Sequence, residues 1–197
     1  MGDYVCLKQR LIDAAKTAES DGLCRHKSGN FSICIRDEEK VLITPSGFLK
    51  AELTPSDILI TDFDGNVTEN INNRKASIEL KMHIAVYKAR SDISAVVHTH
   101  SIYASAFAVA GIKINPVVTE AFFYGNNVEL AEYARPGSNE LAENVKEPIK
   151  KADVCLLKNH GVITVADTIE SALLKAFYVE DVAKIEAISK RLTGAIL

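Results

Sequence analysis

The sequence predicts a single-domain α/β protein, with three layers in the order α/β/α and a mixed, largely antiparallel central sheet. Segments with helical periodicity alternate along the 197 residues with short apolar runs that are typical of strands. Some of these strands come in adjacent pairs joined only by a turn, which a purely parallel sheet does not allow. No repeat, linker or low-complexity segment interrupts the pattern. We therefore expect residues 1–197 to form one domain.

The first third of the chain predicts one helix followed by two pairs of strands. Apolar residues recur at helical spacing over residues 3–21, and Gly22 is a suitable C-terminal cap. We expect the strands at residues 31–36, 40–44, 58–61 and 67–68. A charged turn joins the first pair, and Asp64-Gly65 is a strong hairpin turn for the second pair.

The rest of the chain predicts helices and strands in alternation. We expect helices at residues 77–89, 102–110, 138–150 and 168–191, and strands at residues 95–98, 128–133, 154–158 and 162–165. Ser101 and Ser138 are predicted N-caps, and Gly111 is predicted to end the helix at 102–110. The run at 95–98 is apolar on both faces, which indicates a strand inside the sheet. Residues 114–133 show little regular pattern apart from the short strand.

Composition excludes several kinds of partner. The net charge of −3 offers no basic surface for nucleic acid or for an anionic membrane. The most apolar stretch, residues 102–112, is too short to span a bilayer, which takes roughly twenty apolar residues. The first residues lack the features of a signal peptide, and the four cysteines include no Cys-x-x-Cys pair. We expect a cytoplasmic protein with reduced thiols.

Three of the five histidines stand at the ends of apolar runs. Side chains alternate along a strand, so His98 and His100 face the same way. His160 follows another apolar run, and Gly161 after it allows the backbone to turn sharply. Strand ends are where open α/β sheets place their chemistry. Three imidazoles and one carboxylate are a normal ligand set for Zn²⁺, so the sequence predicts a zinc site.

The carboxylate for this site comes from the segment 76–83. Glu79 and His83 lie four residues apart on a predicted helix and so share one face. Such a pair is often found on a surface, but the apolar neighbours Leu80, Ile84 and Tyr87 indicate a buried helix. One of the two side chains is expected to reach the metal and the other to support it from behind. The spacing does not decide between them.

A second set of residues predicts a pocket for an anion. Its members are small and polar and stand in loops or at a predicted helix start: Gly29 and Asn30, then Ser46 and Gly47, and finally Ser77. Glycine amides and serine hydroxyls form anion-binding nests, and the N-terminus of a helix favours a phosphate. The chain has no Walker or dinucleotide-binding glycine motif, so a nucleotide is not expected.

Five motifs occur in an order that resembles the class II, zinc-dependent sugar-phosphate aldolases. The motifs are Gly29-Asn30-Phe31-Ser32, Thr44-Pro45-Ser46-Gly47, Ser77-x-Glu79-x-x-x-His83, His98-x-His100-Ser101 and His160-Gly161, within a similarity from about residue 7 to about residue 190. This family includes the L-fuculose-1-phosphate aldolases, the L-ribulose-5-phosphate 4-epimerases and the methylthioribulose-1-phosphate dehydratases. The resemblance implies an α/β/α fold with a mixed sheet, and a tetramer with active sites at subunit interfaces.

The same resemblance implies a role for each site residue. His98, His100 and His160 would hold Zn²⁺, with Glu79 as the fourth ligand in the resting site. Glu79 would become the acid/base once substrate displaces it. The substrate phosphate would lie on a set of residues from three loops: Gly29, Asn30, Ser46, Gly47 and Ser77.

The implied reaction is the retro-aldol cleavage of a phosphorylated ketose into dihydroxyacetone phosphate and an aldehyde. Two alternatives stay open: a methylthioribulose-1-phosphate dehydratase that uses the same zinc, and a zinc-binding homologue without activity. Glu79 favours an aldolase or a dehydratase, because the epimerases of the family carry Asp there. Two departures leave the sugar and the aldehyde open. Ile78 replaces a second serine, and no tyrosine stands at Val118, near which the family has an interface tyrosine. Phe122, Phe123 and Tyr124 are close but out of register.

Overall fold

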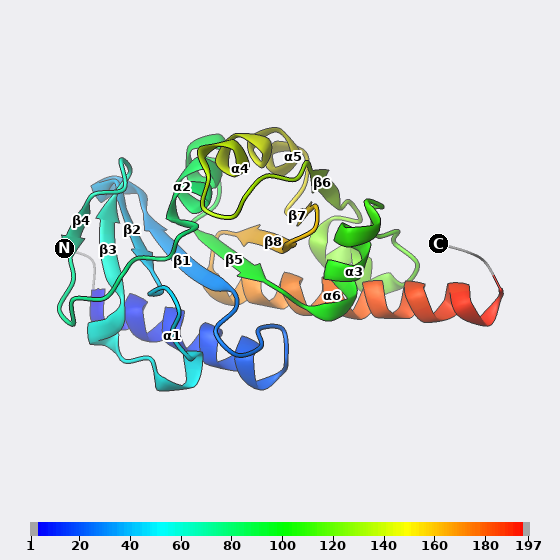
Figure 1. Ribbon diagram of the computed structural model, residues 1–197, viewed down its shortest axis with the longest axis horizontal. Coiled ribbons are helices and arrows are strands. Elements are labelled where there is room, and N and C mark those ends of the chain that lie inside the picture. The colour runs from blue at the N-terminus through cyan, green and yellow to red at the C-terminus, as the bar shows by residue number, and fades with distance from the viewer. Residues whose placement is uncertain (1–3, 195–197) are drawn as a thin grey trace.

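Eight strands form one sheet between two layers of helices (Figure 1). The computed structural model describes residues 4–194. The strands lie in the order β4-β3-β2-β1-β5-β8-β7-β6, and every neighbouring pair is antiparallel except β6 and β7. Their bounds are β1 Asn30–Ile35, β2 Lys40–Ile43, β3 Leu59–Asp62, β4 Val67–Glu69, β5 Ala95–Thr99, β6 Glu129–Ala131, β7 Val154–Leu157 and β8 Gly161–Ala166. The predicted mixed, largely antiparallel sheet is confirmed.

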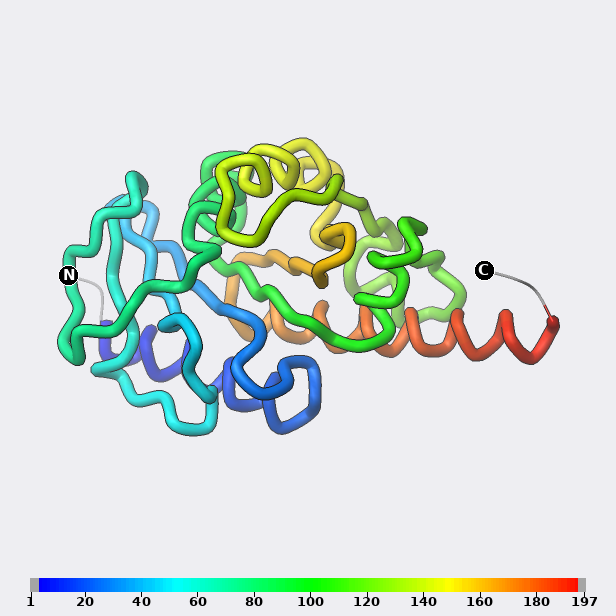
Figure 2. Tube along the Cα trace, in the orientation of Figure 1, coloured from blue at the N-terminus to red at the C-terminus, as the bar shows by residue number. Residues whose placement is uncertain are grey.

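Helices cover both faces of this sheet. The α-helices are α1 Tyr4–Ser20, α2 Leu80–Ala89, α3 Ile102–Ala110, α4 Asn139–Asn144, α5 Lys146–Lys151 and α6 Ile169–Leu192, and the longest 3₁₀ segment is η4 Thr119–Tyr124. One layer holds α1 and α6, and the other holds α2, α4 and α5 (Figure 1). The tube in Figure 2 shows that α6 runs along the sheet and that its last turns extend past it.

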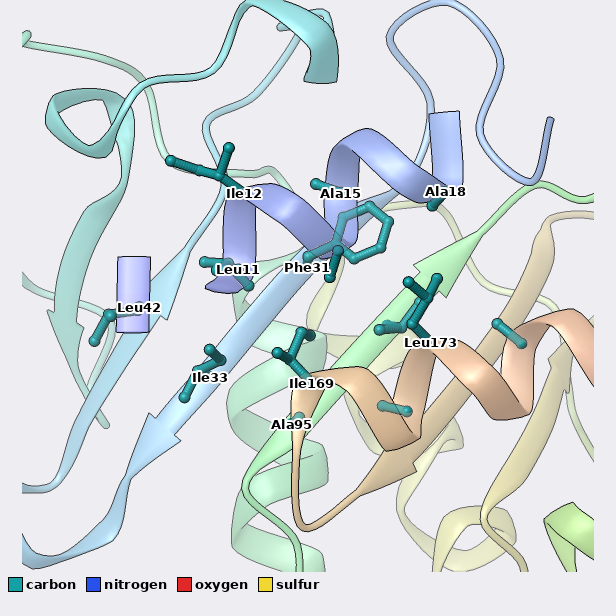
Figure 3. Close-up of a cluster of buried hydrophobic side chains, with 14 of the residues drawn as sticks. Leu11, Ile12, Ala15, Ala18, Phe31, Ile33, Leu42, Ala95, Ile169 and Leu173 are labelled. Atoms are coloured by element: carbon teal, nitrogen blue, oxygen red, sulfur yellow. The ribbon is translucent and has the colours of Figure 1, made fainter. Parts of the chain in front are cut away.

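The alternation of side chains along β5 explains why both faces are covered. Ala95 and Val97 belong to the apolar cluster against α1 and α6, which Figure 3 shows around Phe31 and Leu173. Val96, between them, belongs to the cluster under α2. A central strand with two apolar faces needs a helix layer on each side. His98 and His100 follow Val96 at intervals of two, so the same alternation aims them at the α2 layer.

Two predicted helices differ from the structure. The helix expected at 77–89 begins only at Leu80, so Ser77 lies before it and Glu79 occupies its N-cap position. The helix expected at 138–150 is divided at Val145 into α4 and α5. Pro148 lacks the amide hydrogen that a continuous helix would donate to the fourth carbonyl before it, which accounts for the division. The start expected for α1 at residue 3 lies outside the described residues.

Two predicted caps have different outcomes. The hydroxyl of Ser138 accepts a hydrogen bond from the amide of Leu141 at 3.1 Å and caps α4 as expected. Ser101 stands at the N-cap position of α3, but its side chain makes no cap bond. The carboxylate of Glu180 on α6 instead accepts from the first amides of α3, those of Tyr103 and Ala104, each at 2.9 Å. The serine prediction was wrong because a carboxylate from another element takes the same amides.

Strand pairing brings the three site histidines together. The antiparallel register of β5 and β8 places Thr99 opposite Val162. The end of β5 therefore meets the turn between β7 and β8, which contains His160. On the other side of β5, Asn30 at the start of β1 lies opposite His98. Residues about 130 positions apart in the chain thus share one end of the sheet.

Candidate metal centre and active site

Four side chains converge at this end of the sheet. The potential ligand atoms of Glu79, His98, His100 and His160 all lie within 4.8 Å of one another. The imidazole centroids are 4.9 Å apart for His98 and His100, 4.8 Å for His98 and His160, and 5.0 Å for His100 and His160. The structure therefore brings together the four residues that the sequence analysis chose as metal ligands. His160 lies in the β7–β8 turn, one residue before β8 begins.

The hydrogen bonds around His98 leave its second nitrogen aimed at the cluster. Nδ1 of His98 donates to the carbonyl oxygen of Val162 at 3.0 Å, so Nε2 carries a lone pair. This Nε2 lies 3.0 Å from Nε2 of His100 and 3.1 Å from Oε2 of Glu79. A proton on Nε2 of His100 could form a hydrogen bond to Nε2 of His98, but the contact between His98 and Glu79 would still lack a hydrogen. A metal cation satisfies all of them, so the donor set fits a metal.

Two more atoms of the cluster lack a partner. Oε1 of Glu79 and Nδ1 of His160 are buried and make no hydrogen bond to the described residues. Oε1 lies 3.5 Å from Nε2 of His160. Buried polar atoms are nearly always hydrogen-bonded, and an unpartnered one needs a reason. A metal ion among the four side chains supplies that reason for Oε1.

Burial keeps the imidazoles in the form that binds metals. It lowers the pKa of His100 to about 3 and that of His160 to about 4, and the neighbouring His98 acts in the same direction. Burial alone would raise the pKa of Glu79. The nearby His98 and His160 and the hydrogen bond from Asn30 outweigh it, and the pKa lies well below its ordinary range. Neutral imidazoles and an ionised carboxylate are the states that metal coordination requires.

The backbone at His160 differs from the expected turn. Asn159, with φ of 56°, takes the left-handed conformation that makes the turn, whereas Gly161 is not among the residues with positive φ. A Cβ atom on Gly161 would clash with the carbonyl oxygen of Thr99 and lie 3.1 Å from Cδ2 of His100. Gly161 is therefore needed for close approach of the two strands and not for the turn. The expectation that it makes the turn was wrong.

The structure shows which of Glu79 and His83 faces the cluster. Glu79 does, and His83 lies behind it, with no exposed surface. Its Nε2 lies 2.6 Å from Oδ1 of Asn30, and its Nδ1 lies 2.6 Å from Oγ of Ser32. Burial lowers the pKa of His83 to about 3, so the ring is neutral. Ser32 also bonds the hydroxyl of Tyr87 at 2.7 Å.

A pocket of about 350 Å³ opens beside the cluster. It is lined by Glu79, His100 and His160, by all five predicted anion-binding residues (Gly29, Asn30, Ser46, Gly47 and Ser77), and also by Lys27, Ser28, Pro45, Ile78 and Pro136. Lys27 and Pro136 were not predicted from the sequence, because a loop lysine and a loop proline carry no pattern of their own. A larger cavity of about 530 Å³ lies between α2 and α4, but it contains none of the four cluster residues.

The predicted anion-binding residues present different groups to this pocket. Gly29 has a φ of 75°, and a Cβ there would clash with Cys24 and lie 2.8 Å from the carbonyl oxygen of His98, so only glycine fits. The amide of Ser46 donates to the carbonyl of Lys75 at 2.8 Å, which leaves the hydroxyl for a ligand. Ser77 accepts from the amide of Glu79 at 3.2 Å and keeps its own hydrogen to donate.

The Asn30 side chain is engaged on the protein side of the pocket. Its Nδ2 donates to Oε2 of Glu79 at 2.9 Å, and only 7% of the residue is exposed. The phosphate-binding role that the resemblance implies for Asn30 stays a prediction.

Comparison with known proteins identifies the class to which this fold and site belong. Residues 9–187 match the model of the class II aldolase and adducin N-terminal domain. The chain therefore belongs to the class II aldolase family.

Individual relatives within that family are aldolases of small phosphorylated sugars. The chain is 38% identical over 161 residues to an L-fuculose phosphate aldolase of Methanococcus maripaludis, covering 82% of this chain and 86% of the relative. It is 38% identical over 178 residues to a 5-deoxy-D-ribulose 1-phosphate aldolase of Bacillus thuringiensis, covering 90% and 83%. A solved L-fuculose 1-phosphate aldolase superposes with a TM-score of 0.92 at 32% identity, over 100% of this chain and 93% of that one.

Proposed function

We propose that this protein is a zinc-dependent aldolase that cleaves a phosphorylated ketose, of the L-fuculose 1-phosphate type, into dihydroxyacetone phosphate and an aldehyde. The observation that carries the proposal is the position of Glu79, which lies among three histidines and also lines the adjoining pocket. A carboxylate in that position is close to the metal ligands and to a bound substrate at once. The relatives named above act on sugar phosphates of this kind.

The metal would be held by His98, His100, His160 and Glu79. Three nitrogen donors and a carboxylate favour Zn²⁺ over the harder cations Mg²⁺ and Ca²⁺, which prefer oxygen ligands throughout. When bound, zinc acts as a Lewis acid that stabilises negative charge developing on the substrate's carbonyl oxygen.

Glu79 would move the proton between the substrate and solvent. Its Oε1 has no partner among the described residues, whereas Oε2 accepts the hydrogen bond from Asn30. Oε1 is therefore the oxygen available to take and return a proton. No lysine is assigned to the reaction, because electrostatic stabilisation at the metal replaces the covalent activation that a lysine would supply.

The phosphate of the substrate would occupy the pocket beside the cluster. Hydroxyls of Ser46 and Ser77 and the backbone at Gly29 and Gly47 line it, and no carboxylate other than Glu79 does. Lys27 is a cation on the same wall. Hydroxyl donors and a cation suit a phosphate dianion. Ile78 stands where the family has a second serine, so this side of the pocket contributes one hydroxyl fewer.

The two alternatives from the sequence are less well supported. A methylthioribulose-1-phosphate dehydratase would use the same residues, but the relatives reported above are named as aldolases. A homologue without activity would have no need to keep Glu79 among the histidines with one carboxylate oxygen unpartnered.

The assembly and location belong to the same proposal. Exposed apolar side chains gather on α3 and η4, and they include Phe122 and Phe123. Such a surface is typical of a protein interface and supports a homotetramer with active sites at subunit interfaces. No helix among the described residues is long and apolar enough to cross a membrane. We propose a cytoplasmic enzyme.

Product analysis over a panel of ketose 1-phosphates tests this function. The panel contains L-fuculose, 5-deoxyribulose and 5-methylthioribulose 1-phosphates, each beside its unphosphorylated ketose as a control. We expect dihydroxyacetone phosphate and an aldehyde from at least one phosphate, much slower turnover of the free ketoses, and loss of activity with a chelator. Loss of water without cleavage would establish the dehydratase instead. Absence of turnover from zinc-loaded protein would contradict both activities.

A further inference from the structure

Behind Glu79, four buried side chains form an uninterrupted hydrogen-bond chain, of which the proposed function uses only the last contact, from Asn30 to Glu79. From the core outward they are Tyr87, Ser32, His83 and Asn30. The four successive contacts, ending at Oε2 of Glu79, are 2.7, 2.6, 2.6 and 2.9 Å long. None of the four side chains is more than 7% exposed.

The donor and the acceptor of every hydrogen bond in this series follow from the charge of Glu79 at its outer end. The ionised Glu79 only accepts, so Asn30 turns Nδ2 towards it and Oδ1 towards His83. A carbonyl oxygen opposite Nε2 requires the proton of His83 on that nitrogen. Nδ1 is then an acceptor, and it takes the hydrogen of Ser32.

The bond at the inner end, between Ser32 and Tyr87, has a defined direction as well. Ser32 has used its only hydrogen, so its oxygen accepts from the hydroxyl of Tyr87. The phenol is fully buried and keeps its proton, because burial raises its pKa well above the ordinary value. Each group therefore donates to the next, from Tyr87 to Glu79. One arrangement of protons satisfies the whole chain, and aligned hydrogen bonds strengthen one another.

We propose that Ser32 and His83 are positioning residues for Glu79: through Asn30 they hold Oε2 in place and leave Oε1 turned to the metal and the substrate. The catalytic part of this inference rests on the function proposed above. The Glu79 carboxylate must bind the metal in one state and carry a proton in another. Its plane must therefore be held in one orientation, because small displacements of the reacting atoms lower the reaction rate strongly. Neither Ser32 nor His83 lines the pocket, and their side-chain hydrogen bonds reach Glu79 by way of Asn30.

Removing the serine hydroxyl tests the positioning role. In Ser32→Ala, Nδ1 of His83 loses its donor and the ring is free to move its proton to that nitrogen. Partners behind a metal site typically contribute about 10- to 100-fold in activity or metal affinity, and we expect a fall in kcat of that size. KM should stay within about twofold, because Ser32 does not line the pocket and uniform substrate binding is unchanged. Tyr87→Phe should give a smaller fall in kcat.

Matched controls separate positioning from a general packing defect. Thr61→Val removes a buried hydroxyl that has no partner among the described residues, and Tyr124→Phe does the same for a second buried tyrosine. Both controls should keep the wild-type kcat. If Ser32→Ala and Tyr87→Phe also keep it, or if they raise KM while kcat is unchanged, the proposal is overturned.

A spectroscopic measurement tests the chain without relying on catalysis. Long-range ¹H–¹⁵N correlation spectra of metal-free protein labelled in its histidines report which nitrogen of each ring carries a proton, and the chain has only five histidines. We expect His83 to be protonated on Nε2 alone, and to become a mixture of tautomers in Ser32→Ala. A proton on Nδ1 in the wild type overturns the proposal. If the wild type cleaves no sugar phosphate, the proposed function fails. These spectra still decide whether the hydrogen bonds from Tyr87 to Glu79 form as described.

Discussion

At the level of single residues, the candidate site depends on where lone pairs point. The hydrogen bond from His98 to the carbonyl of Val162 aims the other ring nitrogen at His100 and Glu79. No such bond fixes His160, whose Nδ1 has no partner in the described part of the chain. We therefore expect metal binding to order His160 more than His98.

Loss of one imidazole should remove most of the metal. In His100→Ala, one of three nitrogen donors is lost while the other two keep their places, His98 on β5 and His160 in the β7–β8 turn. We expect zinc content after dialysis to fall severalfold or more, because each imidazole supplies a large share of the affinity. Metal analysis by mass spectrometry checks this result. His26→Ala, in a loop outside the cluster, is the control and should keep its zinc.

Replacing the proposed proton-carrying carboxylate of Glu79 should lower the catalytic rate while metal binding is largely kept. Glu79→Gln keeps the size of the side chain but cannot take up a proton, and the three histidines still bind zinc, though more weakly. General acid–base catalysis contributes about 10²- to 10⁴-fold, so kcat should fall by about that factor.

Zinc content and turnover of Glu79→Gln are best measured on the same preparation. A variant with full zinc and near-normal kcat would contradict the assigned role, and the proton carrier would have to be sought among other residues. Glu140→Gln, an exposed substitution at the start of α4, is the matched control for the change of charge.

At the level of helices and strands, the fold was predictable where the spacing of apolar residues shows which face of an element is buried. Alternation along residues 95–100 was enough to place His98 and His100 together and to bury both faces of β5. Gly22 and Gly111 were enough to predict where α1 and α3 end. These features depend on near neighbours in the chain, which is why one sequence can show them.

Features that depend on distant contacts could not be predicted in this way. The hydrogen-bond chain behind Glu79 joins β1 to α2, and no local pattern distinguishes Ser32 or Tyr87 from ordinary core residues. The cap of α3 by Glu180 joins two helices that are far apart in the chain. Gly161 was correctly noticed, but its reason is the approach of a neighbouring strand, which only the sheet register shows.

The start of β8 should tolerate no side chain at Gly161. In Gly161→Ala, the new methyl group would clash with the carbonyl of Thr99 and press on the rings of His98 and His100. Overpacking of this kind costs about 1–3 kcal/mol of stability. Displaced ligands should also lower metal affinity by roughly 10- to 100-fold, as other changes around metal ligands do.

A second glycine supplies the control for this substitution. Gly125 has a φ of 84°, and a Cβ on it would meet no atom within 4 Å, so Gly125→Ala brings backbone strain without a clash. It should cost about 1 kcal/mol of stability and leave zinc affinity unchanged. Competition with a chelator measures the affinities. If both variants bind zinc as the wild type does, close approach at Gly161 has no bearing on the site.

For the molecule as a whole, buried histidines link stability to pH. Burial lowers the pKa values of His83, His100 and His160 to about 3, 3 and 4 in the folded protein. In the unfolded chain, a histidine titrates near pH ~6.5. The unfolded state therefore binds more protons below about pH 6.5, and acid must destabilise the metal-free fold.

The melting temperature of metal-free protein should fall as the pH is lowered from about 7 to about 5. Most carboxylates stay ionised in both states over this range, because their ordinary pKa values are about 4. Replacing His160 by glutamine removes one buried titrating group and should make the fall shallower. An unchanged melting temperature between the two pH values would contradict the buried, neutral state of these rings.

The proposed assembly would cover apolar surface that a single chain leaves exposed. Phe122 and Phe123 on η4 are 76% and 57% exposed, and Val109 on α3 is 63% exposed. Phe123 stacks on Tyr178 of α6 with the ring centroids 4.6 Å apart. Aromatic residues on a surface are typical of subunit contacts. Light scattering should report a tetramer for the wild type.

A charge within this surface should dissociate the tetramer. Phe122→Asp places a carboxylate in an apolar contact, where burying an unpaired charge is costly. The variant should give a smaller species, with activity reduced in parallel, because the active sites are proposed to lie at subunit interfaces. Ile71→Asp is the control, since Ile71 is 63% exposed but follows β4 at the opposite edge of the sheet. A wild-type monomer at enzyme concentrations used for assay would contradict this assembly, and full activity from monomeric Phe122→Asp would place the complete active site within one chain.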